Sequence, residues 1–297
     1  MKRLCLVVCA LALLACERQP AEYQPEFSPP AASAMHEYVV GIHPLHNPKR
    51  LVELYGPVID HLNASIPQAH FRLEASRNYE DFDKKLFSGY FDFAMPNPYQ
   101  TVRSLKYGYH VFGKMGDDEL FRGIILVRKD SGIAQVSDLK GKKVAYPSPS
   151  ALAATLMPQY YLHTHGLNVN RDIENLYVGS QESVIMSVLR GHVAAGATWP
   201  VPWRTFSQEH PAEAAQLEVR WQTEMLPNNG WVVRQDVPLA LTESVGRALV
   251  DLSDTAGGRA TLTRLGITHF EAANDEIYLP VRRYLERFSA TVRPIEY

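Results

Sequence analysis

Cysteine is scarce in this chain: only three of its 297 residues are Cys, and all three fall within the first 16 positions. The rest of the chain therefore offers no thiol for a disulfide, a catalytic nucleophile or a thiolate metal site. A folded region without disulfides must rest on its hydrophobic core. The roughly 260 residues after the N-terminal segment are enough to build a large core and suit two lobes.

An excess of charge is also missing, since 30 Lys and Arg stand against 32 Asp and Glu. This balance argues against a nucleic-acid-binding protein. After the N-terminal segment, no stretch is long and apolar enough for a transmembrane helix. The sequence also lacks a Gly-x-Ser-x-Gly elbow, a His-Glu-x-x-His pair and a Walker loop. We therefore expect neither an enzyme nor a cofactor.

The N-terminus is typical of a targeting segment. Two basic residues precede the apolar stretch 4–14, which is too short to span a bilayer comfortably. A small residue before Cys16 at the end of this stretch resembles the bacterial lipoprotein signal. We expect a signal peptide over 1–15 and lipidation of Cys16; an ordinary secretory peptide or a short membrane anchor is the alternative.

The segment 16–36 differs in composition from the rest of the chain. After Cys16 it contains four prolines and several Ala, Ser and Glu residues. This composition is typical of a flexible tether. The folded region should therefore begin near Glu37.

Short apolar, β-branched runs alternate with amphipathic stretches along the rest of the chain. A first series predicts strands at 38–42, 71–75 and 91–95 and helices at 48–63 and 79–87. A second series predicts strands at 143–146, 173–177 and 194–198, a helix after Ser150 and a helix at 182–190. This alternation predicts βαβ units with parallel sheets, so the fold class is α/β.

Two further apolar runs, 121–127 and 230–234, are interpreted as extended crossings between two lobes. The predicted domains follow from these crossings. The first part of lobe 1 covers 37–126, and lobe 2 covers 127–229. Residues 230–297 form the return crossing and the C-terminal helices of lobe 1. A cleft between two lobes is a common ligand site.

A strand that runs directly into a helix is the main sign of a binding site. The apolar run 143–146 stops at Pro147-Ser148-Pro149-Ser150, and a helix-favouring stretch follows. The first turn of a helix has free N–H groups and the positive end of the helix dipole, so it can bind an anion. The alternative is that Ser148 or Ser150 simply caps the helix.

Loops at the ends of other predicted strands also carry polar or aromatic side chains, and ligands of open α/β folds bind at such ends. His43 follows the first strand, and Tyr79 begins a predicted helix. Tyr79 is suited to contact a ligand, or alternatively to pack in the core. Asn97 is suited to contact a ligand, or alternatively to form a turn. Trp199 is suited to an aromatic pocket wall or to the core.

Two pairs of histidines, 43 with 46 and 163 with 165, invite a metal interpretation. Their spacing matches no recognised zinc pattern, and no cysteine assists them. No metal site is therefore expected.

These segments together resemble the solute-binding proteins of phosphate, phosphite and phosphonate ABC importers, the phosphonate-binding-protein-like family. The similarity covers roughly 39–252 and rests on an ordered set of short matches. They are Gly41-Ile42-His43-Pro44, Ser76-Arg77-Asn78-Tyr79, 89–98, 127–132, 136–145 and 179–199. The resemblance implies a periplasmic-binding-protein fold of type II: two α/β lobes, two extended crossings, and a ligand cleft between the lobes.

The resemblance also implies binding residues. Phosphonate binders of the family hold the anion with hydroxyls and amides where the helix after 143–146 begins. They often have Ser-Thr-Ser-Gly where this chain has Ala-Leu-Ala-Ala at 151–154. The expected ligand-binding residues are His43, Tyr79, Asn97, Tyr99, Ser148, Ser150, Ala151, Gln181 and Trp199.

The function implied by the resemblance is the capture of a small ligand for an ABC importer, first a phosphonate, phosphite or phosphate-type oxyanion. The expected partners are the ligand, an ABC permease, and the membrane through the lipid on Cys16 alone. The protein would then act as a periplasmic monomer. The alternative is a ligand-sensing envelope lipoprotein that reports to a sensor kinase or another membrane partner.

Overall fold

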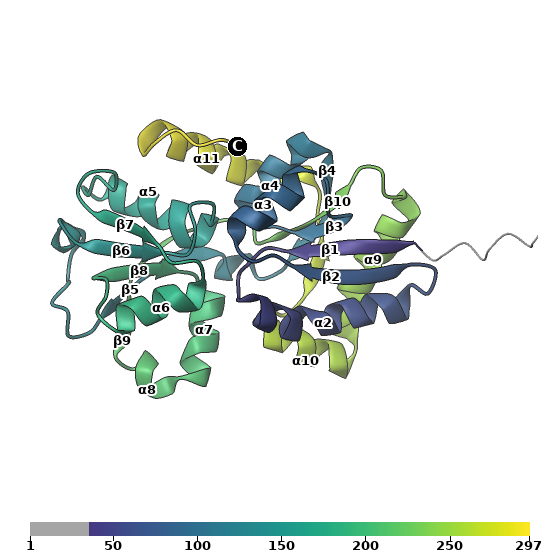
Figure 1. Cartoon of the computed structure of the whole chain (residues 1–297), viewed down its shortest axis with the longest axis horizontal. Coiled ribbons are helices and arrows are strands. Elements are labelled where there is room, and N and C mark those ends of the chain that lie inside the picture. Colours follow the sequence, from purple (N-terminus) through teal and green to yellow (C-terminus); the bar gives the residue numbers. More distant parts are fainter. Residues whose placement is uncertain (1–35) are drawn as a thin grey trace, which may run out of the picture. The chain divides into compact units, whose positions relative to one another are not determined.

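The computed structural model describes residues 36–297, which form one compact unit. The expected signal peptide, the lipidation of Cys16 and the tether up to residue 35 lie outside the described residues. The described chain contains two β-sheets, each flanked by helices (Figure 1). We call residues 36–121 and 226–297 lobe 1 and residues 122–225 lobe 2, according to the sheet to which their strands belong.

Lobe 1 is built on a six-stranded sheet with the order β11-β4-β10-β3-β1-β2. Its strands are β1 (Glu37–Ile42), β2 (His70–Ala75), β3 (Phe93–Met95), β4 (Tyr109–Met115), β10 (Gly230–Arg234) and β11 (Phe270–Ala272). The first three are parallel, whereas β10 is antiparallel to both of its neighbours. The α-helices are α2 (Pro48–Ser65), α3 (Tyr79–Phe87), α4 (Pro98–Ser104), α9 (Leu239–Asp251), α10 (Ala256–Leu265) and α11 (Leu279–Thr291).

Lobe 2 is built on a five-stranded sheet with the order β7-β6-β8-β5-β9. Its strands are β5 (Arg122–Arg128), β6 (Lys143–Tyr146), β7 (Glu174–Tyr177), β8 (Ala195–Thr198) and β9 (Leu217–Met225). The helices are η4 (Leu152–Leu156), α5 (Met157–Thr164), α6 (Gln181–Leu189), α7 (Pro200–Glu209) and α8 (Pro211–Ala214). Two sheets of this kind confirm the predicted α/β class and the two lobes.

Local sequence signals explain why these elements form where they do. The helix α2 begins at Pro48, because the side chain of Asn47 accepts a hydrogen bond from the Arg50 N–H and proline tolerates the first helical turn. Its buried residues recur every three or four positions and cover β2. The central strands β6 and β8 are buried almost throughout, as parallel strands covered on both faces must be.

The apolar run 121–127, interpreted from the sequence as a crossing between the lobes, has a different role in the structure. Most of it forms β5, which pairs with β8 and β9 inside the sheet of lobe 2. Likewise, the run 230–234 is β10, in the middle of the sheet of lobe 1. An extended apolar run is what a buried strand requires, so sequence alone does not separate the two roles. The chain crosses between the sheets in two short connections, 116–121 and 226–229.

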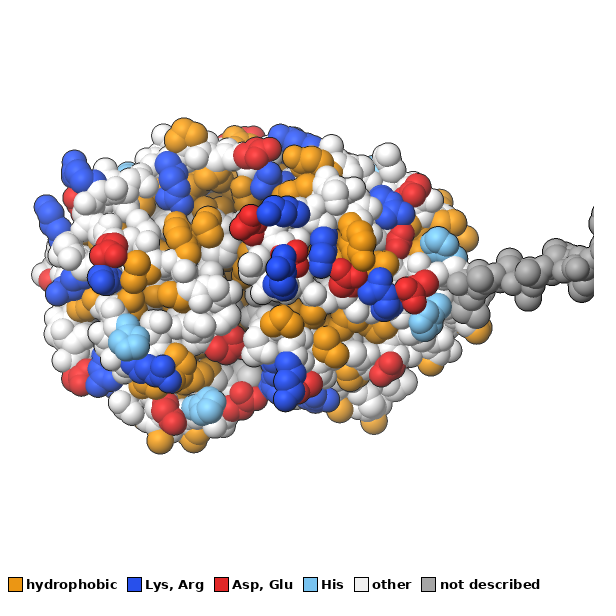
Figure 2. All heavy atoms as spheres, in the orientation of Figure 1, with side chains coloured by type: hydrophobic (Ala, Val, Ile, Leu, Met, Phe, Trp, Pro, Cys, Tyr) orange, Lys and Arg blue, Asp and Glu red, His pale blue; other side chains and the backbone are white. Residues whose placement is uncertain are grey.

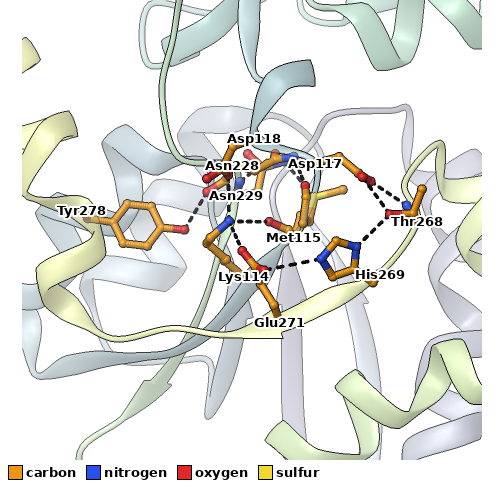
Figure 3. Close-up of polar contacts among 11 residues, drawn as sticks. Lys114, Met115, Asp117, Asp118, Asn228, Asn229, Thr268, His269, Glu271 and Tyr278 are labelled. Carbon is orange, nitrogen blue, oxygen red and sulfur yellow. Dashed lines mark hydrogen bonds and ion pairs between the residues drawn. The ribbon is translucent and has the colours of Figure 1, made fainter.

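The two connections run side by side and are fastened to lobe 1 by a polar network (Figure 3). The N–H of Leu226 donates to the carbonyl of Phe121 at 3.1 Å. Asn228 donates its backbone N–H to Asp118 Oδ1 at 2.8 Å, and its carbonyl accepts from the Tyr278 hydroxyl at 2.6 Å. The first bond joins the lobe 2 ends of the two connections, and the other two fasten Asn228 to Asp118 and to lobe 1. We call this framework the hinge network.

A buried lysine lies at the centre of the hinge network. The side chain of Lys114 is 5% exposed, and its ammonium contacts Asp118 Oδ1 at 2.7 Å and the Met115 carbonyl at 3.2 Å. It also forms an ion pair with Glu271. Burial raises the pKa of Glu271, but the hydrogen bond and charge of Lys114 outweigh burial and leave that pKa below its usual range.

Residues 292–297 contact both lobes. On lobe 2, the Val292 carbonyl accepts from Asn170 Nδ2 at 2.7 Å, and Arg293 donates to Gln159 Oε1 at 2.6 Å. On lobe 1, the carbonyl of Glu296 accepts from the Tyr99 hydroxyl at 2.7 Å. We call residues 292–297 the C-terminal bridge.

On the face shown in Figure 2, acidic and basic side chains are intermixed, without a broad patch of one sign. Within residues 36–297, no helix combines the length and apolar character needed to cross a membrane.

Candidate functional site

A small cavity separates the two lobes next to the connections. It is lined from lobe 1 by His43, Tyr79, Asn97, Phe121 and Asn229 and from lobe 2 by Ala151, Leu152, Ala153, Ala154, Gln181 and Trp199. Its volume is about 10 Å³, close to the minimum that holds one water molecule. We call this space the interlobe cavity.

The wall from lobe 2 is the start of a helix. The π-helical turn η4 begins after Ala151, which has no side chain able to cap it. Thr155 and Leu156 donate their N–H groups to the Ala151 carbonyl, whereas the N–H groups of 152–154 find no acceptor among the described residues. Unpaired N–H groups at a helix start, next to a cavity, form a site suited to an anion.

Neither Ser148 nor Ser150 caps this helix, which corrects the capping alternative drawn from the sequence. Their hydroxyls lie 3.2 Å apart, and the Ser148 carbonyl accepts from Thr155 Oγ1 at 2.7 Å. The helix begins one residue later than a serine cap would require. Both serines and Tyr99 line a separate, larger cavity of about 680 Å³ beneath the C-terminal bridge.

Asn97 connects the two lobes directly. Its Oδ1 accepts from the N–H groups of Tyr99 and Gln100 and so caps α4, with Gln100 completing a capping box. Its Nδ2 donates to the Ser150 carbonyl of lobe 2 at 3.0 Å. The turn role and the functional role weighed for this residue are therefore compatible, since one side-chain atom serves each.

Two variants of Asn97 should separate these roles. Asn97→Ala loses both, and we expect a loss of about 1–2 kcal/mol in the free energy of unfolding. Asn97→Asp keeps an oxygen that caps α4 but cannot donate to Ser150, so we expect near wild-type stability with a larger fraction of open molecules. Chemical denaturation and small-angle scattering measure the two quantities. Equal scattering from Asn97→Asp and the wild type would contradict a role in closure.

Tyr79 and Gln181 line the interlobe cavity from opposite lobes. Gln181 Oε1 accepts from Thr198 Oγ1 at 2.8 Å, which leaves its NH₂ group as a donor. Burial raises the pKa of Tyr79, and a hydrogen bond with Gln181 counteracts only part of that effect. Tyr79 is therefore a neutral phenol that can also donate a hydrogen bond.

His43 is held in one orientation. Its Nδ1 lies 2.9 Å from the Met95 carbonyl, which can only accept, so Nδ1 carries the hydrogen. Burial lowers the pKa of His43 to about 4, despite the opposing hydrogen bond to Met95 and with a further contribution from His46. The ring is therefore neutral near pH 7, and its Nε2 is an acceptor.

A second bond between the lobes joins His46 and Glu182. The atoms His46 Nδ1 and Glu182 Oε1 lie 2.9 Å apart. Burial raises the pKa of Glu182, but the hydrogen bond and charge of His46 reverse this, so the pKa is lower than usual. Glu182, in the first turn of α6, therefore also contacts lobe 1.

The tryptophans fall in different environments. Trp199 lines the interlobe cavity and lies near Phe121, with 5.8 Å between ring centroids. Trp231 is buried in the core of lobe 1, and Trp203 packs on Phe206.

Among residues 36–297, no three His, Cys, Asp or Glu side chains gather as metal ligands would.

Sequence reasoning missed Asn229 as part of the cavity wall. This residue is 1% exposed, its Nδ2 donates to Met115 Sδ at 3.2 Å, and its Oδ1 has no partner among the described residues. The only signal was the polar pair Asn228-Asn229 before an apolar strand, which also fits an ordinary turn.

Two α/β lobes, two adjacent connections and a polar cavity between the lobes define a two-lobed binding protein. Residues 40–278 match the family model described as "ABC transporter, phosphonate, periplasmic substrate-binding protein". The chain therefore belongs to this family, as the resemblance of its sequence predicted. The members of this family are not enzymes.

Individual relatives agree with the family. A probable ABC transporter phosphite-binding protein of Prochlorococcus marinus is 25% identical over 128 residues, which are 40% of this chain and 43% of that relative. A crystal structure of this relative with methylphosphonate has a TM-score of 0.78 at 17% identity, covering 85% of this chain and 98% of the other.

A binding-protein component of an ABC phosphonate transporter from Pseudomonas aeruginosa is also similar. It has a TM-score of 0.79 at 16% identity, covering 86% of this chain and 87% of that chain. These structural likenesses confirm the two-lobed type II fold.

Proposed function

We propose that this protein captures a small tetrahedral oxyanion between its lobes and delivers it to an ABC permease. A phosphonate is the first candidate for this ligand. The observation that supports this most is the helix start at Leu152, where three N–H groups that find no acceptor within 36–297 adjoin the interlobe cavity. Names of the relatives add support, since one is called a phosphite-binding protein and was crystallised with methylphosphonate.

The proposed ligand contacts follow from the cavity lining. The backbone N–H groups of 152–154 would bind the anion together with Tyr79, Asn97 and Gln181, while His43 and Trp199 would complete the wall. Ala151 would contribute through the turn of backbone it begins. Tyr99, Ser148 and Ser150 would contribute indirectly, since they line the larger neighbouring cavity.

Binding would require the lobes to move apart and close again. A volume of about 10 Å³ leaves no room for a tetrahedral oxyanion, which is several times larger than a water molecule. A ligand that contacts both lobes only in the closed form shifts the equilibrium towards closure. With the anion bound the lobes would lie slightly further apart than in this structure, so the bonds of Asn97 to Ser150 and of His46 to Glu182 would have to lengthen or shift.

Calorimetry and thermal melting of the purified protein with methylphosphonate, phosphite and phosphate test the proposal. We expect binding heat and a raised melting temperature with at least one of the three. Tyr79→Phe keeps the shape of the ring but removes a donor to a charged ligand, so affinity should fall about 10-fold or more.

Tyr109→Phe is the matched control for the tyrosine variant. The Tyr109 hydroxyl donates to the Phe91 carbonyl in the core of lobe 1, outside the cavity. Its loss should change stability while leaving affinity unchanged. Absence of heat and of any melting shift with all three anions would refute the capture of phosphorus oxyanions.

We also propose that Cys16 carries the lipid that holds the protein at the periplasmic face of a membrane. The support is the apolar stretch that ends in a small residue before this cysteine. Cys16→Ser should release the protein from the membrane fraction.

The alternative function is that of a ligand-sensing lipoprotein. Unchanged ligand uptake in cells that lack the gene would favour this alternative.

A further inference from the structure

The donors of the interlobe cavity alone do not select among tetrahedral anions. N–H and O–H groups bind sulfonate, sulfate and phosphonate oxygens alike, because all of these oxygens accept hydrogen bonds. A phosphonate monoanion differs from a sulfonate in one respect: it retains one P–OH and so can also donate. Acceptors in the cavity wall are therefore the groups able to discriminate.

Asn229 supplies the first such acceptor. Its amide orientation is set by Met115, since a thioether sulfur accepts hydrogen bonds and cannot donate, so the nitrogen must face it. The oxygen Oδ1 then lies on the other side of the amide, without a partner among the described residues. Figure 3 shows Asn229 next to Met115 at the connection between the lobes. A buried acceptor without a partner is costly unless a donor arrives.

His43 supplies the second acceptor. The bond from Nδ1 to the Met95 carbonyl fixes the hydrogen on that nitrogen. Nε2 of the neutral ring then has a lone pair and no hydrogen, and the residue lines the same cavity as Asn229. Both acceptors belong to lobe 1, whereas the unpaired N–H groups of 152–154 belong to lobe 2.

We propose that the interlobe cavity selects oxyanions that carry a hydrogen-bond donor, such as a phosphonate monoanion with its P–OH, and rejects fully ionised sulfonates. The charged oxygens would face the N–H groups of η4, and the P–OH would donate to Asn229 Oδ1 or His43 Nε2. This inference rests on the proposed function and names the substrate class within it. A site built to accept from a ligand O–H rejects the analogue without it, because its buried acceptors stay unpaired.

The test is calorimetry of the full chain with methylphosphonate and with methanesulfonate at pH 6. The two anions have similar shape, and at this pH a substantial share of the phosphonate keeps one proton. We expect a preference of about 100-fold or more for methylphosphonate. Asn229→Leu, of similar size but without an acceptor, should reduce the preference at least about 10-fold. Asn229→Asp retains an acceptor and should keep the preference.

Ser76→Ala is the matched control. Ser76 is also buried, and its side-chain oxygen has no partner in the described part of the chain, but it does not line the interlobe cavity. Its variant should show the wild-type preference. Equal affinity of the wild type for the two anions would overturn the inference and leave oxyanion capture intact. Binding of neither anion would instead remove the proposed function and the inference with it. The wild-type comparison needs no variant and so does not depend on Asn229→Leu folding.

Discussion

Neutralising both carboxylates of the hinge network, with Asp118→Asn and Glu271→Gln combined, is expected to lower the free energy of unfolding by about 3 kcal/mol. The reason is the buried ammonium of Lys114, whose side chain is only 5% exposed. Its carboxylate partners among the described residues are these two. Without them the charge retains only uncharged acceptors, the Met115 carbonyl and the amide oxygens of the two new side chains, and a buried charge without a counter-charge is strongly unfavourable.

Adding Lys114→Met to the double variant is the control. Methionine fills similar space without charge, so the triple variant should recover most of the lost stability. The Asn at position 118 still accepts from the Asn228 N–H, so that bond is kept in both proteins. Urea denaturation at pH 7 measures the difference. A loss below about 1 kcal/mol in the double variant would contradict a desolvated Lys114 and indicate that water reaches its ammonium.

The stability of the wild type should fall by about 3 kcal/mol more than that of His43→Asn between pH 7 and pH 4. Burial lowers the pKa of His43 to about 4 in the folded protein, whereas an unfolded chain has a histidine pKa of about 6.5. Above about pH 6.5 both states are neutral, and the contribution is complete. As pH falls, the unfolded state binds the proton first, so the folded state loses its advantage.

Denaturation of the two proteins over a pH series measures this difference. Asparagine can still donate to the Met95 carbonyl but does not titrate, so it isolates the ionisation of the ring. If both proteins lost stability equally, His43 would not be buried and neutral. That result would also remove His43 Nε2 as an acceptor in the interlobe cavity.

The fold could be predicted from sequence where strands are short, apolar and followed by helices. The elements β1, α2 and β6 satisfy this condition. The strand β9 was missed because its side chains are mostly half-exposed and include charges, as suits an edge strand. The strand β4 includes the buried Lys114, whose ion-pair partner Glu271 is distant in sequence. Short β11 offers too few residues for a pattern.

The site could be predicted in part for a related reason. Several residues of the cavity lie in loops or helix starts that come soon after a strand, so local sequence predicts their place at the edge of a sheet. Among them are His43, Tyr79, Asn97 and Ala151. The position of Ser150 depends on where the next helix begins: the N-cap is Ala151, and Ser150 lines the larger cavity beneath the C-terminal bridge.

Phe121 and Asn229 also line the cavity. They lie on the connections between the lobes. Leu226 bonds the carbonyl of Phe121, and Asn228 bonds Asp118 and Tyr278, so each bond joins residues that are distant in sequence. No local pattern contains that information.

The C-terminal bridge makes the closed form observable at a distance from the ligand. It accepts from Asn170 and donates to Gln159 on lobe 2, and it accepts from Tyr99 on lobe 1. Separation of the lobes must break one set, so the bridge can join both lobes only while they are closed. A ligand that holds the lobes together would therefore also hold in place a segment that lies outside the interlobe cavity.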